Sequence, residues 1–298
     1  MILQNIHYQR WFLLVILFSV TWSCSTPESS QQLDPVVEEK QHQLMLWEAS
    51  KGEQRLYILG TFHLGISPDE LDRLVWDYLQ ESQLVILEMD ISNVNPGEAL
   101  PYMFLPPEQS LQNILEPKAW QELKKRLSPQ IPEEKLERLS LTAVFQILIG
   151  QIAPHGESID LAILKKARAA GKTTAFLETF AFQAQLLQTF IEPEMIADLL
   201  TKQDEARQFF NRMVDIYLAG DPQKLDQLIR EQDSEFAMSE DQFQTMVVSR
   251  NRRWLKILPE ILGQEPAFIA VGAGHLPGPD GLLSLLEEEG YQLRRLGS

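Results

Sequence analysis

The chain has 298 residues, 44% of them hydrophobic, and can therefore bury a sizeable core in one large domain or two small ones. Its 42 acidic and 26 basic side chains give a net charge of −16, which argues against nucleic acid as a partner because phosphate binding needs clustered Lys and Arg. The single cysteine excludes an intramolecular disulfide, so the fold must depend on its core.

The first residues have the composition of a secretory signal, and we expect a lipoprotein-type signal peptide over residues 1–23. Arg10 precedes the apolar run "WFLLVILFSVTW", which is too short to span a membrane in the mature protein. Cys24, in "VTWSC", stands where a bacterial lipoprotein signal places its lipidated cysteine. The alternatives are an ordinary signal peptide cut near Cys24 and an uncleaved anchor.

Residues 24–40 are rich in Ser, Pro and Glu, which predicts a flexible tether between a membrane surface and the folded domain. A serine after Cys24 favours, by resemblance to such lipoproteins, the outer membrane. We therefore expect a protein of the bacterial cell envelope that faces the periplasm and contacts the membrane through its lipid anchor.

Residues 41–298 are expected to form one α/β domain. Two strand-like runs, "HQLMLWEAS" and "EQRLYILG", flank the turn residues Lys51 and Gly52 and predict a hairpin. A helix is predicted to start at Ser67 as N-cap, with Glu70 as the acid of a capping box. The strand "QLVILEMD" follows and ends at Glu88, which completes a β-α-β unit.

The rest of the chain alternates helical insertions with further strands. Two insertions are predicted, at about 96–155 and 193–248. Between them "KTTAFLET" predicts a strand that ends in Glu178, and after them "AFIAV" and "YQLRRL" predict two more, separated by a helix over 277–289. The expected fold class is α/β, with a central mostly parallel or mixed β-sheet flanked by helices and a large helical insertion.

Four side chains follow predicted strands directly: His63, Glu88, Glu178 and His275. The carboxyl ends of strands in α/β sheets form the ligand crevice, and residues there converge from distant parts of the sequence. A lone histidine after a strand is more often a hydrogen-bonded turn residue. Here "GTFH" and "GAGH" repeat the same Gly-x-x-His context, which favours a functional role for both imidazoles.

The glycines of these motifs have an expected structural purpose. Gly60 and Gly272 would let the chain leave the strand with torsions that other residues resist, and would let the backbone approach a ligand closely. Gly274 stands directly before the second histidine. His42 and His155 are predicted to be structural or solvated.

Two neutral imidazoles and a carboxylate form a recurrent ligand set for a catalytic divalent metal that keeps one position open for water. Arg250, at the start of the helix before the last core strand, is either a solvated helix start or a partner for a site carboxylate. The sequence has no phosphate-binding glycine loop, zinc-type cysteine cluster, His-Glu-x-x-His helix or nucleophile elbow.

The chain resembles the TraB/GumN family, which includes the TIKI-type metalloproteases and is related to the erythromycin-esterase and ChaN-like folds. The matching stretches include "LYILGTFHLG", "LVILEMD", "SRNRRW" and "VGAGHLPGPDG". By motif, the resemblance places His63 and His275 at the family's histidines, Glu88 and Glu178 at its acids and Arg250 at its arginine. It implies divalent-metal-dependent peptide cleavage in the TIKI branch, whereas other branches are linked to peptide pheromone shutdown or have no assigned reaction.

We therefore expect a lipid-anchored, metal-dependent hydrolase that acts on a peptide or protein substrate. His63, His275 and Glu88 would hold Mn, Co or Zn, Glu178 would act as general base or support a ligand, and Arg250 would stabilise the oxyanion. One alternative is a surface protein that captures a peptide or a haem-like ligand without turnover. The other is a metal-free esterase with one histidine as base.

Overall fold

The computed structural model describes residues 44–153, 158–231, 234 and 236–297. The predicted signal peptide, Cys24 and the tether lie outside the described residues, as do His42 and His155. Within the described ranges, every helix is too short or too polar to cross a lipid bilayer.

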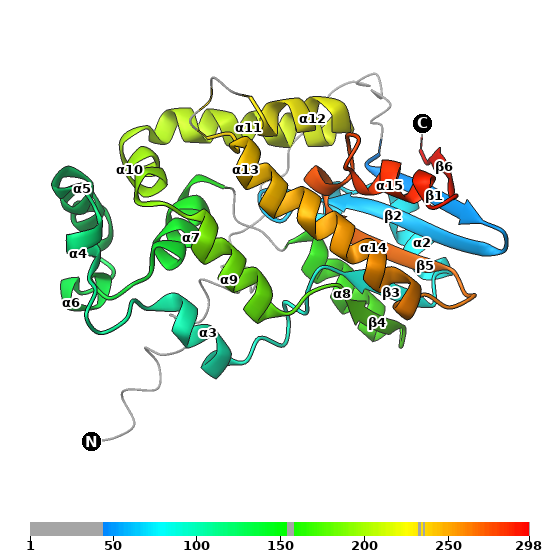
Figure 1. Ribbon diagram of the computed structural model, residues 1–298, viewed down its shortest axis with the longest axis horizontal. Coiled ribbons are helices and arrows are strands. Elements are labelled where there is room, and N and C mark those ends of the chain that lie inside the picture. The colour runs from blue at the N-terminus through cyan, green and yellow to red at the C-terminus, as the bar shows by residue number, and fades with distance from the viewer. Residues whose placement is uncertain (1–43, 154–157, 232–233, 235, 298) are drawn as a thin grey trace, which may run out of the picture.

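A six-stranded mixed sheet forms the centre of the fold, which confirms the predicted α/β class (Figure 1). The strand order is β4-β3-β5-β2-β1-β6, with β5 and its two neighbours running parallel, β4 parallel to β3, and β1 antiparallel to both β2 and β6. The strands are β1 Leu46–Lys51, β2 Gln54–Thr61, β3 Leu84–Leu87, β4 Thr173–Phe176, β5 Ala267–Gly272 and β6 Gln292–Arg295. Strand β5, which comes late in the chain, therefore lies between β2 and β3, the two strands of the predicted β-α-β unit.

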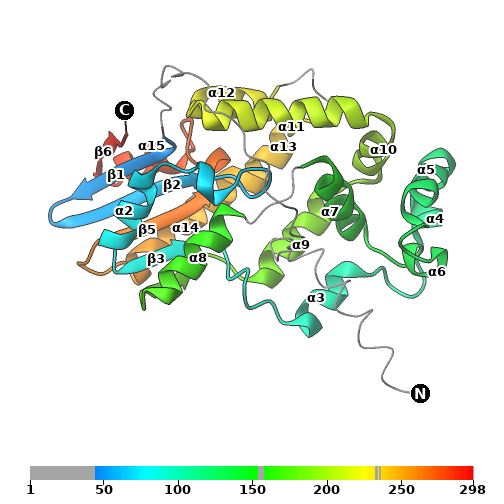
Figure 2. The same ribbon diagram turned by 180° about the vertical axis from the view of Figure 1, so that it is seen from behind.

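Helices cover both faces of the sheet. Helices α2 (Arg73–Glu81) and α8 (Ile159–Ala169) lie on one face, and α14 (Ser249–Ile261) and α15 (Leu282–Glu288) lie on the other (Figures 1 and 2). All six residues of β5 are buried, as expected for a parallel strand that is covered on both sides.

Two predicted helices differ from the observed ones. The capping box between Ser67 and Glu70 is present, but it starts a 3-10 turn, η1 Pro68–Glu70, because the next residue takes an extended backbone. Asp72 then caps α2 as a second helix start. The predicted helix over 277–289 is likewise shorter, since the chain first forms the 3-10 turn η3 Ala273–His275 and reaches α15 only at Leu282.

Outside the sheet layers, several helices contribute buried residues to a second hydrophobic core: α4 Leu111–Ile114, α5 Pro117–Leu127, α6 Glu133–Leu136, α7 Leu141–Ile152, α10 Pro193–Thr201 and α11 Gln203–Leu218. Helices α3 Pro96–Met103 and α9 Phe180–Phe190 lie against α7. Helix α12 Pro222–Ile229 contributes Leu225 to the core of the sheet, and α13 Glu240–Phe243 contributes Phe243 to a third, small cluster. Phe62 packs against both the second core and the core of the sheet. Tyr217 on α11 also donates a hydrogen bond to the carbonyl of Gly60 (2.9 Å), so the helical region is joined to the sheet at the carboxyl end of β2.

Candidate functional site

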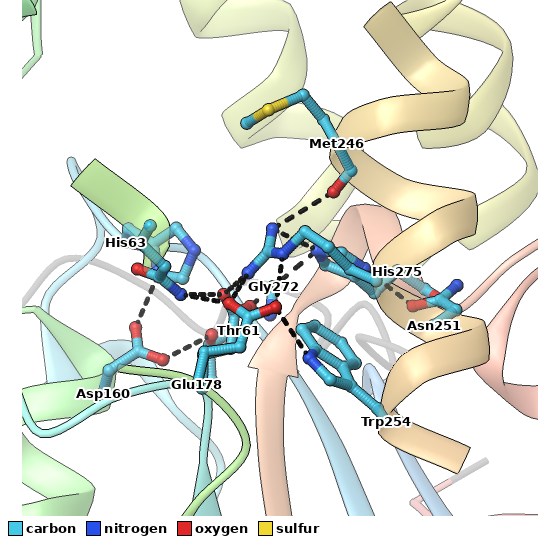
Figure 3. Close-up of polar contacts among 12 residues, drawn as sticks. Thr61, His63, Asp160, Glu178, Met246, Asn251, Trp254, Gly272 and His275 are labelled. Carbon is cyan, nitrogen blue, oxygen red and sulfur yellow. Dashed lines mark hydrogen bonds and ion pairs between the residues drawn. The ribbon is translucent and has the colours of Figure 1, made fainter. Parts of the chain in front are cut away.

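The strand order brings all four strand-end residues to one edge of the sheet. His63 follows β2, His275 follows β5, Glu88 follows β3 and Glu178 follows β4, and these are the four neighbouring parallel strands. Because parallel strands end at the same edge, residues from distant parts of the chain meet there. Arg250 reaches the same point from α14 and forms hydrogen bonds with Glu178, His275 and Glu88. Figure 3 shows the network of polar contacts at this edge of the sheet.

The centre of this site is the space that Gly272 leaves by having no side chain. A Cβ at this position would lie 3.2 Å from Nε2 of His63, 3.3 Å from Oε1 of Glu88 and 3.6 Å from Cδ2 of His275. The backbone N–H of Gly272 also donates to Oε1 of Glu88 (2.7 Å). Both imidazoles and one carboxylate therefore face a common point.

The torsional reason predicted for the two motif glycines is wrong. Neither Gly60 nor Gly272 has a positive φ, so no unusual torsion requires glycine at either position. Packing within the protein requires glycine at the first position, because a Cβ at Gly60 would lie 2.8 Å from Leu276 and 3.0 Å from the backbone of Ala273. Gly60 thus lets the end of β2 pack against the turn that carries His275.

Arg250 is the cation of the site, and each of its five N–H groups has an acceptor. Nε and Nη2 donate to the two oxygens of Glu178 at 2.9 and 2.8 Å, and Nη2 also donates to Oε2 of Glu88 at 2.5 Å. Nη1 donates to the carbonyl of Met246 (3.1 Å) and to Nε2 of His275 (3.0 Å). The guanidinium is 8% exposed, and the neighbouring carboxylates raise its pKa against the effect of burial, which alone would lower it.

Glu178 has no free acceptor position in the plane of its carboxylate. Besides the two bonds from Arg250, Oε1 accepts from the indole N–H of Trp254 (2.9 Å) and Oε2 accepts from the amide of Gln183 (2.9 Å). The side chain is fully buried. These contacts suit a residue that holds the guanidinium in place better than one that takes a proton from water.

Glu88 is ionised in this setting. Burial alone would raise its pKa, but the charge of Arg250, the two imidazoles and the N–H of Gly272 together hold the pKa well below its ordinary value. Its Oε1 accepts only from Gly272 among the described partners and faces the central space.

His275 is neutral and presents a lone pair to the site. Asn251 donates both amide hydrogens to the carbonyls of His275 (3.0 Å) and Asp280 (2.9 Å), so its Oδ1 must accept from Nδ1–H of His275 (2.8 Å). Nε2 then carries no hydrogen and accepts from Arg250. Burial, together with the charge of Arg250, lowers the pKa of His275 to about 3, although Glu88 opposes the shift.

His63 has a pKa that is shifted in the opposite direction to that of His275. Its Nδ1 lies 2.9 Å from Oδ2 of Asp160, and a carboxylate can only accept, so Nδ1 carries the hydrogen and Nε2 faces the central space. Desolvation would lower the pKa of His63, but the charge and the hydrogen bond of Asp160 outweigh it and raise the pKa to about 9. The side chain is 59% exposed, which makes His63 the member of the site that is open to solvent.

The donor set fits a divalent cation in its chemistry. Two imidazole Nε2 atoms and a carboxylate oxygen are the ligands that Zn²⁺, Mn²⁺ and Co²⁺ accept, and Nε2 of His275 lies 4.0 Å from Oε1 of Glu88. The site also contains three buried carboxylates, on Glu88, Asp160 and Glu178, against one guanidinium. Because the raised pKa of His63 keeps that ring protonated at neutral pH, one surplus negative charge remains, and an ion bound to Nε2 of His63 would replace its proton. No group of three or more His, Cys, Asp or Glu side chains in the described part of the chain is already gathered around a single ion position.

Sequence reasoning missed several residues of the site. Asp160 and Thr61, which donates to Asp160 (2.8 Å), were not singled out, and neither were Gln183 and Trp254. Asp160 and Gln183 stand in the first turns of α8 and α9, where polar residues are common for reasons of helix capping. For Gln183 the sequence did contain an indication. The start of α9 follows the carboxyl end of β4 after a short connection, so a residue in its first turn lies beside Glu178.

A separate cavity of about 390 Å³ lies elsewhere, beside the β1–β2 hairpin and the C-terminal half of α14. Its lining includes Lys51, Pro259 and Tyr291 and none of the residues of the strand-end site. The lysine is already bonded to the carbonyl of Glu289. The chemistry therefore gathers at the strand ends and not in this cavity.

Comparisons with known proteins identify a family and two relatives. The model of the TraB/PrgY/gumN family matches residues 45–295. Metalloprotease TIKI2 of Danio rerio is 22% identical over a 366-residue alignment that covers 95% of this chain and 67% of the relative. Metalloprotease TIKI1 of Danio rerio is 23% identical over 313 residues, which cover 83% of this chain and 62% of the relative. This chain thus spans roughly two thirds of either relative, and no solved structure matches it significantly.

Proposed function

This chain belongs to the TraB/PrgY/gumN family, and we propose that it is a metal-dependent hydrolase that cleaves peptides or proteins. Two relatives are named as metalloproteases, at low identity and over part of their length. The observation that carries the proposal is the convergence of His63 Nε2, Glu88 Oε1 and the His275 ring on the space left by Gly272.

In this proposal His63, Glu88 and His275 would hold the ion. A bound divalent ion supplies a water of lowered pKa and polarises the substrate carbonyl. Glu88 contributes a carboxylate that is already ionised, and His275 contributes an Nε2 whose lone pair is fixed by Asn251. His63 is the exposed ligand, so it also borders the path by which substrate enters.

Arg250 has a role that follows from its five hydrogen bonds. An ion held by Nε2 of His275 would displace the Nη1–H of Arg250 from that lone pair. The released N–H could then donate to a developing oxyanion. Glu178 holds the other side of the guanidinium and so would keep Arg250 beside the site.

The test is metal binding and cleavage by the purified domain beside its His63→Ala variant. We expect Mn²⁺, Co²⁺ or Zn²⁺ to raise the melting temperature of the wild type and to support cleavage of a peptide library, with both effects removed by chelator. His63→Ala should lose both. An equal metal response in the two proteins would overturn the ligand assignment, and stable binding of peptide or haem without cleavage would show a capture protein instead.

A metal-free hydrolase is the second candidate, because the hydrogen bond between Asp160 and His63 is also the arrangement of a general base. In that case His63 Nε2 would take a proton from water, and turnover would persist in chelator. Loss of all turnover in chelator would exclude it.

We also propose that the chain is anchored in the bacterial envelope through lipidated Cys24. The support is the sequence "VTWSC" after a short apolar run. Cells that express the full chain should incorporate labelled palmitate into it and retain it in the membrane fraction, whereas Cys24→Ala should abolish the label. An unlabelled wild-type chain would overturn this proposal.

A further inference from the structure

Asp160 occupies an unusual position for an acid near the start of a helix. It is the second residue of α8, where acidic side chains commonly stabilise the helix by interacting with its free backbone N–H groups. That need is already met, since Ser158 caps α8 by accepting from the N–H of Leu161. The two side-chain hydrogen bonds of Asp160 go instead to Thr61 and His63, which belong to the end of β2.

The surroundings of Asp160 fix its carboxylate in one orientation. The residue is 6% exposed, and Oδ1 accepts from the hydroxyl of Thr61, which is 1% exposed. With Oδ1 held by this buried donor, Oδ2 is directed at Nδ1 of His63 at 2.9 Å. His63 itself is exposed, so Asp160 is the contact that keeps an otherwise mobile ring in one place.

The hydrogen bond also selects the tautomer of the ring. A carboxylate offers no hydrogen, so the Nδ1 atom must donate, and the lone pair of the neutral ring is then on Nε2. Nε2 is the atom that faces the space beside Gly272, next to Glu88. His275 reaches the same tautomer through the amide oxygen of Asn251, so the two rings present equivalent atoms by different means.

We infer that Asp160 is a positioning residue of the site: through its hydrogen bond to Nδ1 it holds the His63 ring and directs the Nε2 lone pair to the point where the reaction takes place. The inference rests on the proposed function in that His63 Nε2 must act there, either as a metal ligand or as a base. Thr61 supports Asp160 and not His63 directly.

Asp160→Asn is the informative substitution because it keeps the shape of the side chain. Its Oδ1 can still accept from Thr61, while the amide now donates to Nδ1 of His63 and forces the hydrogen onto Nε2. For the wild type and for Asp160→Asn we would measure Zn²⁺ and Co²⁺ affinity by calorimetry. We expect the variant to bind about 10- to 100-fold more weakly.

Two further proteins separate a positioning role from a structural one. Thr61→Val should weaken binding less than Asp160→Asn does. Asp72→Ala, which removes the N-cap acceptor of α2, should lower the melting temperature and leave metal affinity unchanged.

A second measurement does not depend on metal. The ¹⁵N chemical shifts of His63 at a pH where the ring is neutral report which nitrogen carries the hydrogen. We expect the Nδ1–H form in the wild type and the Nε2–H form in Asp160→Asn. If the wild type binds no metal, the metal-dependent part of the proposed function fails and this measurement still decides the inference. An unchanged tautomer, or unchanged affinity in Asp160→Asn, would overturn it.

Discussion

The Nη1 atom of Arg250 donates a 3.0 Å hydrogen bond to Nε2 of His275, the same lone pair that an ion in the site would need. The guanidinium and a metal therefore compete for one atom of His275. Because Arg250 also neutralises Glu88 and Glu178, it cannot be removed without leaving two buried carboxylates unpaired.

Arg250→Met should for this reason destabilise the fold strongly. Loss of one partner of a buried ion pair costs about 3–5 kcal/mol, so we expect a reduction of that order in the free energy of unfolding, measured by urea denaturation. Arg252 is the matched control on the same helix, since it is 65% exposed and pairs with Asp280. Arg252→Met should cost about 1 kcal/mol or less, and equal losses for the two variants would contradict this view of the site.

Glu178→Gln tests whether Glu178 supports Arg250 or acts as the general base. In the variant, the side-chain amide N–H of residue 178 would face the N–H donors that the carboxylate accepts from in the wild type. If Glu178 supports Arg250, we therefore expect the free energy of unfolding to fall by about 3 kcal/mol and activity to be lost as well. A base that exchanges protons with water would lose activity and keep stability. Glu260→Gln, on the exposed side of α14, should stay within about 0.5 kcal/mol of the wild type.

Gly272→Ala should fill the space in which the site residues meet. The new methyl group would lie 3.2 Å from His63 Nε2 and 3.3 Å from Glu88 Oε1, and these side chains can yield by the few tenths of an ångström that it requires. We expect a folded protein whose melting temperature no longer responds to metal. Gly263→Ala, where a Cβ meets nothing within 4 Å, should respond like the wild type, and a normal metal response in Gly272→Ala would place the ion elsewhere.

The metal-free protein should lose stability as the pH falls below about 6.5. His275 has a pKa lowered to about 3 in the fold, against 6.5 when unfolded, so in this window the unfolded chain binds a proton that the native protein does not. Above pH 6.5 the neutral His275 contributes its full stabilisation. Below pH 6.5 the free energy of unfolding falls as the pH falls, with a limiting slope of about 1.4 kcal/mol per pH unit. Urea denaturation between pH 6.5 and 5 should show this slope, and His275→Gln should flatten it. An identical slope in the variant would mean that other groups are responsible.

The effect of His63 on the free energy of unfolding has the opposite dependence on pH. Its pKa is raised to about 9, so the stabilisation it provides is fully present below pH 6.5 and is lost as the pH rises through 9. Asp160→Asn should remove this alkaline loss in the metal-free protein, as followed by melting temperature between pH 7 and 10. An alkaline loss of the same size in both proteins would assign it to another group.

The sequence was sufficient to predict the sheet and the edge at which chemistry gathers, because strand ends are marked by apolar runs that stop at polar residues. The order of the strands was not predictable in the same way, since nothing local to "AFIAV" indicates that β5 lies between β2 and β3. The supporting residues were missed for a related reason. Asp160 has the local sequence of a helix start, and only the tertiary contact with β2 distinguishes it from one.

The sequence predicts Arg250 as a partner for a site carboxylate or as a helix start, but it marks Asn251 only as part of the opening of a helix. The structure places a π-helical turn, η2 Gln244–Val248, directly before α14. Such turns occur often at functional sites, and here it precedes two consecutive residues that both contact His275. Helical periodicity in a sequence does not reveal an extra residue in one turn, so this feature required coordinates.

The central position of β5 has a consequence for the timing of folding. A ribosome-bound chain that ends before Ala267 has neither the strand that separates β2 from β3 nor His275, and its sheet lacks its middle. Pairing across such long sequence separations is slow to form. The strand-end site is thus incomplete during translation until the last part of the domain has been synthesised, and a prematurely terminated product that stops before β5 would lack it.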